Sequence, residues 1–161
     1  MKLILSLFTG LFLFFQTSDL DALRNAYSKA NLSNEGAKNF IEIAEKNSSS
    51  DPLTKGYKAA AEILEAKVTK EKNKRKSFVK SGATELESVI KSNPNNVELR
   101  LIRMSVQENI PKIVGYSKNL KEDKMFIIDN YSRQNPALKT YIRKFAAQSK
   151  TMNAAEKNSL R

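Results

Sequence analysis

Apolar residues recur every three to four positions along most of the chain after residue 18, which is the spacing of one face of an α-helix. Seven segments show this pattern: residues 20–30, 37–44, 53–68, 78–90, 99–106, 125–131 and 138–146. No segment has the apolar–polar alternation and the β-branched enrichment that are typical of a strand. We therefore predict an all-α fold of about seven amphipathic helices, with one more short helix over residues 153–160.

Polar residues between these segments predict where the helices begin. Asp51-Pro52 and Asn135-Pro136 each place a capping side chain directly before a proline. Proline suits the first turn of a helix because the N–H that it lacks would have no partner there. Pro94 predicts a break between two helices. Because short connections favour antiparallel neighbours, we expect antiparallel helix pairs in a helical-repeat-like arrangement, with an irregular helical bundle as the alternative.

The first 18 residues have a different character. Lys2 is followed by an apolar run over residues 3–15, interrupted only by three small or polar residues. A helix of that length spans about 20 Å, whereas the hydrocarbon core of a bilayer is about 30 Å thick. A short apolar run after a positive charge is typical of a secretory signal peptide. We predict a signal peptide over residues 1–18, and the alternative is an uncleaved N-terminal anchor.

The remaining residues, 19–161, are predicted to form a single all-helical domain that is exported to the periplasm or secreted. No segment after residue 18 approaches the length of about 20 apolar residues that crosses a membrane. The mature chain is therefore expected to contain no transmembrane segment.

One segment carries a resemblance to a known family. Residues 81–106 read SGATELESVIKSNPNNVELRLIRMSV, with the small Gly82, the large apolar Leu86 and Val89, a turn at Pro94 and then a new helix. This order resembles one repeat junction of the tetratricopeptide-type helical repeats. The whole chain also resembles small uncharacterised exported helical proteins of Gram-negative bacteria. The resemblance implies stacked helix pairs with a groove between them, and such grooves bind peptide segments.

Two residue types are absent from the whole sequence, which contains no His and no Cys. Ser-His-Asp and Cys-His catalytic sites are therefore excluded, and zinc, copper, haem and iron–sulfur centres lose their usual ligands. Glu85 with Glu87, and Glu122 with Asp123, stand too close along a helix to face each other across a cleft as glycosidase carboxylates do. We predict that the protein is not an enzyme and uses no cofactor or metal.

Positive charge is the other marked feature, with 28 Lys and Arg against 17 Asp and Glu and a formal net charge of +11. The densest basic run supplies a candidate anion-binding patch. Its members are Lys67, Lys70, Lys72, Lys74, Arg75 and Lys76. A solvated linker between two helices is the alternative, and we favour it because Glu71 interrupts the run and no aromatic residue precedes Phe78. Without stacking aromatics among the basic residues, nucleic acid is not the favoured partner.

These observations together favour a protein–protein interaction module in the cell envelope. Its expected partner is another envelope or secreted protein, because stacked helix pairs form peptide-binding grooves. The alternative is a basic protein that binds anionic lipid or glycan surfaces through its net charge.

Overall fold

The structure is a computed structural model of the chain and describes residues 19–160. The predicted signal peptide, residues 1–18, lies outside the described residues. Residues 19–160 contain helices and no strands, so the all-α prediction is confirmed. Residues 19–30 are helical and are followed by α2 (Asn34–Lys46), α3 (Pro52–Val68), α4 (Arg75–Ser92), α5 (Val97–Asn109), α6 (Leu120–Asn130), α7 (Pro136–Gln148) and α8 (Ala154–Asn158). Short 3₁₀ turns are η1 (Lys72–Lys74), η2 (Lys112–Val114) and η3 (Tyr131–Arg133).

Helix starts are set by local side-chain caps where the sequence predicts them. The Asp51 carboxylate accepts hydrogen bonds from the backbone N–H groups of Leu53 and Thr54, and the Asn135 side chain accepts one from Leu138. These bonds satisfy N–H groups that have no partner inside the helix. None of the helices between residues 19 and 160 combines the length and the apolar character needed to cross a bilayer.

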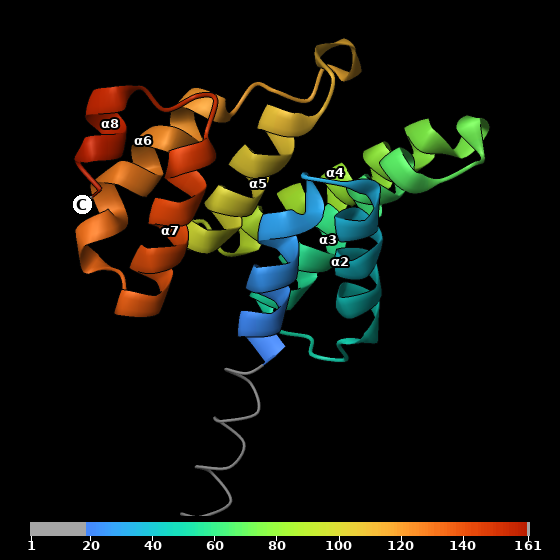
Figure 1. The fold of residues 1–161 in the computed structure, drawn as a ribbon, viewed down its shortest axis with the longest axis horizontal. Coiled ribbons are helices and arrows are strands. Elements are labelled where there is room, and N and C mark those ends of the chain that lie inside the picture. Colours follow the sequence, from blue (N-terminus) through green and yellow to red (C-terminus); the bar gives the residue numbers. More distant parts are fainter. Residues whose placement is uncertain (1–18, 161) are drawn as a thin grey trace, which may run out of the picture.

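Helix α5 lies at the centre of the fold. Figure 1 shows α5 (yellow) between the N-terminal helices on one side and α6, α7 and α8 on the other. Residues 97–107 are buried with the single exception of Arg100. A helix that is buried all round has no solvent face and belongs entirely to the core.

The two faces of α5 belong to two different hydrophobic clusters. Leu99, Ile102 and Val106 pack with the helix of residues 19–30 and with α2, α3 and α4. Leu101 and Met104 pack instead with α6, η3, α7 and the C-terminal segment. Full burial of a side chain of this size contributes about 1.5–3 kcal/mol, so α5 stabilises both halves of the structure.

Buried charges join α5 to helices on both sides. The Glu98 carboxylate accepts hydrogen bonds from Arg24 Nε at 2.8 Å, from Arg24 Nη2 at 2.6 Å and from the Tyr57 hydroxyl at 2.7 Å. Arg103 donates to Asp123 Oδ2 at 2.7 Å and to Asp123 Oδ1 at 2.6 Å. Paired charges of this kind offset the cost of their own burial only while both partners are present.

Helices α3 and α4 form a hairpin in which the two axes approach closely at Gly82. A Cβ atom at Gly82 would lie 2.6 Å from the Ala59 carbonyl oxygen and 2.7 Å from Ile63 Cγ1. The first contact is with backbone, which cannot rotate away. The absence of a side chain at residue 82 therefore sets the distance between α3 and α4.

We expect Gly82→Val to lower the free energy of unfolding by about 1–3 kcal/mol, because the added atoms force the two helices apart. Chemical unfolding followed by circular dichroism measures this loss. Ser81→Val is the matched control, since it adds the same side chain at an exposed position of the same helix. An equal loss in both variants would show that the helix propensity of valine, and not the close approach, causes the effect.

Candidate binding groove

A groove of about 1110 Å³ runs between the α3–α4 hairpin and the C-terminal end of α5 with the turn that follows it. The hairpin is the green pair that extends to the right in Figure 1, and η2 is the turn at the top of the same view. The groove is partly enclosed by these elements and open to solvent along one side. Its apolar lining residues include Ile63, Leu64, Val79, Ala83, Val106, Ile110, Ile113 and Val114.

The charged residues that line this groove are all basic. They are Lys67 from α3 and Arg75, Lys76 and Lys80 from α4, and no Asp or Glu is among the lining residues. Among the residues that the structure describes, Lys67, Lys76 and Lys80 form no ion pair with a carboxylate. The groove therefore combines apolar walls with uncompensated positive charge.

Helix geometry explains why α4 supplies most of this charge. Lys76 and Lys80 are four residues apart and lie on the same face of the helix, as Arg75 and Val79 do. The face continues to Ala83, so it changes from basic to apolar along the helix.

The basic residues of the predicted anion-binding patch fall into two groups in the structure. Lys67, Arg75 and Lys76 line the groove, whereas Lys70, Lys72 and Lys74 do not; all six are exposed. Lys74 forms an ion pair with Glu71 at 2.8 Å. Lys70, Lys72 and Lys74 lie in the mostly exposed segment 69–74 that connects α3 to α4, whereas Lys67 is in the last turn of α3 and Arg75 and Lys76 begin α4.

Lys80 is the one basic residue of the described groove lining that lies outside the anion-binding patch predicted from the sequence. It stands outside the dense basic run, and only its helical spacing from Lys76 places it on the same face. That relation becomes visible once α4 is known to begin at Arg75 rather than near Phe78.

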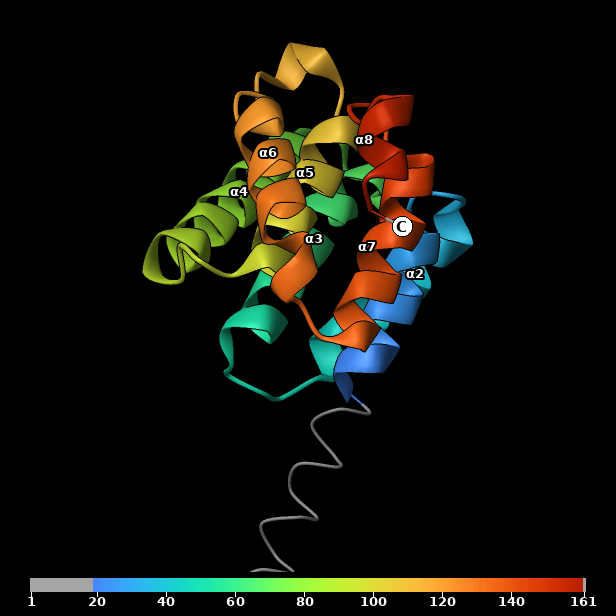
Figure 2. The same cartoon turned by 90° about the vertical axis from the view of Figure 1, so that its left-hand side faces the viewer.

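The turn around η2 forms the wall opposite the hairpin. Ile113 is 96% exposed and Val114 is 42% exposed, although both line the groove. Gly115 ends the turn with a φ of 74°, a left-handed conformation that glycine adopts without strain. Figure 2 shows this turn projecting from the end of the molecule. Two adjacent apolar side chains are thus presented to solvent at the edge of an apolar groove.

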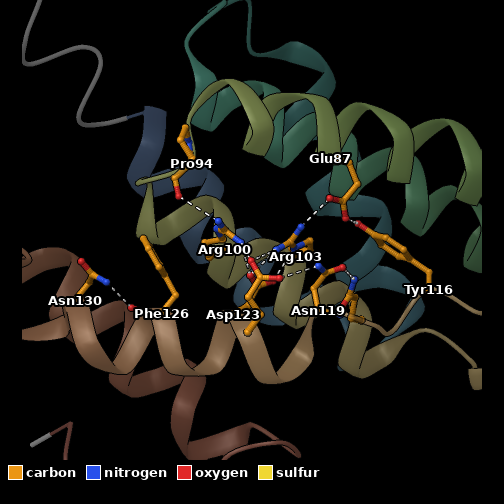
Figure 3. Close-up of polar contacts among 11 residues, drawn as sticks. Glu87, Pro94, Arg100, Arg103, Tyr116, Asn119, Asp123, Phe126 and Asn130 are labelled. Atoms are coloured by element: carbon orange, nitrogen blue, oxygen red, sulfur yellow. Dashed lines mark hydrogen bonds and ion pairs between the residues drawn. The ribbon is translucent and has the colours of Figure 1, made fainter.

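Hydrogen bonds fix this wall to the rest of the fold. The Tyr116 hydroxyl donates to Glu87 Oε1 at 2.8 Å, and Arg103 Nη1 donates to Glu87 Oε2 at 2.7 Å. Figure 3 shows Glu87 between Tyr116 and Arg103, with Asp123 on the other side of the guanidinium group. Burial and the bond to Glu87 raise the pKa of Tyr116 above its ordinary value. The segment after η2 is therefore connected through Glu87 to both α4 and α5.

The carboxylates of α6 are engaged in the same network. Glu122 Oε1 lies 2.6 Å from Arg100 Nη1, and Asp123 is held by Arg103. Hydrogen bonds from Asn119 and Arg100 lower the pKa of Glu122. Within residues 19–160, no three Asp or Glu side chains form a group that could hold a metal ion.

No protein-family model, curated protein or solved structure matches this chain. The groove is consequently the feature from which we infer the function.

Proposed function

We propose that this protein is an exported, non-enzymatic interaction module of the cell envelope, and that its groove binds a segment of another protein. The observation that carries the proposal is the open apolar groove of about 1110 Å³ with its basic edge. Sites for small molecules measure roughly 300–1,000 Å³ and enclose most of the ligand surface. A larger and open groove suits a length of polypeptide better.

The mode of binding follows from the secondary structure. Residues 19–160 contain no strand, so this part of the chain offers no sheet edge to which a peptide could add as a further strand. Recognition then depends on side chains, as when a helix lays its apolar face into a hydrophobic groove. The single positive side chain of Lys2 and the apolar run over residues 3–15 support export, which brings the module to partners in the envelope.

Affinity capture from an envelope extract, with parallel washes at low and high salt, tests this proposal. We expect Val114→Asp to weaken retention of the bound protein by about tenfold or more, because it places a charge on the apolar wall. Met125→Asp is the control, since Met125 is 45% exposed on α6 and does not line the groove. The captured protein is then purified and its affinity for all three forms of the chain is measured by calorimetry.

Two results would contradict the proposal. Equal affinity of the wild-type chain and Val114→Asp for every captured protein would exclude the groove as the binding surface. Retention at low salt alone, of lipid, glycan or many acidic proteins together, would favour the basic surface-binding alternative, because exposed charges are screened beyond a Debye length of about 8 Å at physiological salt.

A further inference from the structure

We infer that the segment bound in the groove is an acidic amphipathic helix, an inference that rests on the proposed function and specifies its partner. The charges in the groove lining are four basic residues and no carboxylate. An occupant with acidic residues along one edge and large apolar residues on its inner face matches both properties of the lining.

The charges gather near one end of the groove, whereas the apolar residues extend along both of its walls. Lys67 is in the last turn of α3 and Arg75 and Lys76 are in the first turn of α4, so the basic residues gather toward the tip of the hairpin. Apolar residues line both walls, with Leu64 and Val79 on the hairpin side and Val114 on the opposite side. A helix bound along this groove would place its acidic residues near the hairpin tip and its apolar stripe between the two apolar walls.

The positive charge near the start of α4 is also electrostatically unfavourable for that helix. Its first turn contains Arg75 and Lys76 with no acidic residue, and no side chain in the described part of the chain forms a capping hydrogen bond at its N-terminus. The helix dipole favours negative charge at this end, and like charges four residues apart, such as Lys76 and Lys80, repel each other. Carboxylates of a bound segment would relieve both effects. Departures from local sequence preferences are expected at functional positions.

An anionic lipid matches the charge but not the shape. A bound acyl chain gains affinity from burial of nearly its whole surface, and an open groove would leave one side of the chain in water. An amphipathic helix buries one face only and keeps its polar face solvated. The observed groove therefore favours the helix.

Selection from displayed amphipathic helices with a constant apolar stripe and an acidic, neutral or basic polar face tests the inference. The bait is the protein purified from cells that express the full-length gene. We expect acidic helices to be enriched, and Lys76→Glu with Lys80→Glu to weaken their binding by about tenfold or more. Lys70→Glu with Lys72→Glu is the matched control, because it changes the net charge equally outside the groove. Exchange of helix Glu residues for Lys should restore binding to the first variant.

Each other outcome has a distinct meaning. Enrichment of neutral or basic helices that lose binding to Val114→Asp would overturn the acidic partner while leaving the proposed function intact. If both pairs of substitutions weakened helix binding equally, the acidic-partner inference would also be overturned, because the attraction would then come from net charge. The absence of any groove-dependent helix would overturn both proposals. Phosphatidylglycerol vesicles that bind through Lys76 and Lys80 in that case would identify a lipid site. Circular dichroism of each variant verifies that its helices are intact.

Discussion

Replacement of Arg103 by methionine is expected to lower the free energy of unfolding by about 3–5 kcal/mol, the usual result of removing one partner from a buried ion pair. The Arg103 side chain is 4% exposed and Asp123 is fully buried. Methionine keeps much of the length and apolar character of the arginine stem but leaves the carboxylate without its two strongest hydrogen bonds. Arg100 Nη1 lies 3.1 Å from the same carboxylate and is the one charged partner left to it among residues 19–160.

Chemical denaturation followed by far-UV circular dichroism measures this loss. Lys46→Met is the control, because it breaks the ion pair with Glu42, in which both side chains are more than half exposed. Such surface pairs contribute about 0–1 kcal/mol. Addition of Asp123→Asn to Arg103→Met should recover part of the stability, since it removes the unpaired charge. A loss in Arg103→Met no greater than in Lys46→Met would show that the buried pair is not a determinant of the fold.

Alkaline unfolding is the second large effect that we expect. Burial raises the pKa of Tyr27, Tyr57 and Tyr141 above the ordinary value, as it does that of Tyr116, and the Tyr57 hydroxyl also lies beside Glu98. In the unfolded chain these tyrosines ionise near pH 10, whereas in the folded chain they remain neutral. The stability that they contribute is therefore complete below pH 10 and is lost as the pH rises toward their folded pKa values. The three most deeply buried of these groups, Tyr27, Tyr57 and Tyr141, remove roughly 4 kcal/mol per pH unit above pH 10, and Tyr116 adds a smaller loss.

Tyrosinate absorbance and far-UV circular dichroism, recorded together during an alkaline titration, test this expectation. We expect the buried tyrosines to ionise only as helix content is lost, so that the two transitions coincide. Tyr141→Phe should reduce the loss of unfolding free energy per pH unit by the contribution of one tyrosine, because phenylalanine has no ionisable group. Ionisation of all five tyrosines near pH 10 with the helices intact would contradict the burial of these hydroxyls.

The features that the sequence predicts correctly are local ones. The starts of α3 and α7 depend on Asp51 and Asn135, whose side chains bond to N–H groups within three residues. The apolar face of a helix likewise depends on spacing within that helix. Because these properties depend on residues that are close together in the sequence, the sequence alone predicts the helices and the all-α class.

The features that the sequence does not predict depend on packing between distant segments. Arg24 and Glu98 are 74 residues apart, and nothing near either residue indicates that they pair. The groove combines residues from α3, α4 and α5 with the turn at η2, so its lining becomes visible only after these elements pack. The basic run illustrates the difference, because its charge is evident from the sequence but the division between groove and open surface is set by where α4 begins.

The burial of α5 on both faces also constrains how this chain can change over evolutionary time. In proteins built from stacked repeats, each unit contacts only its neighbours, and units can be gained or lost with little effect on the others. Here neither half can be deleted or exchanged without exposing one apolar face of α5. Insertions and sequence drift are tolerable at the hairpin tip and around η2, whose residues are exposed. Substitutions can therefore accumulate at the hairpin tip and around η2, whereas the helices that cover the two apolar faces of α5 must be retained.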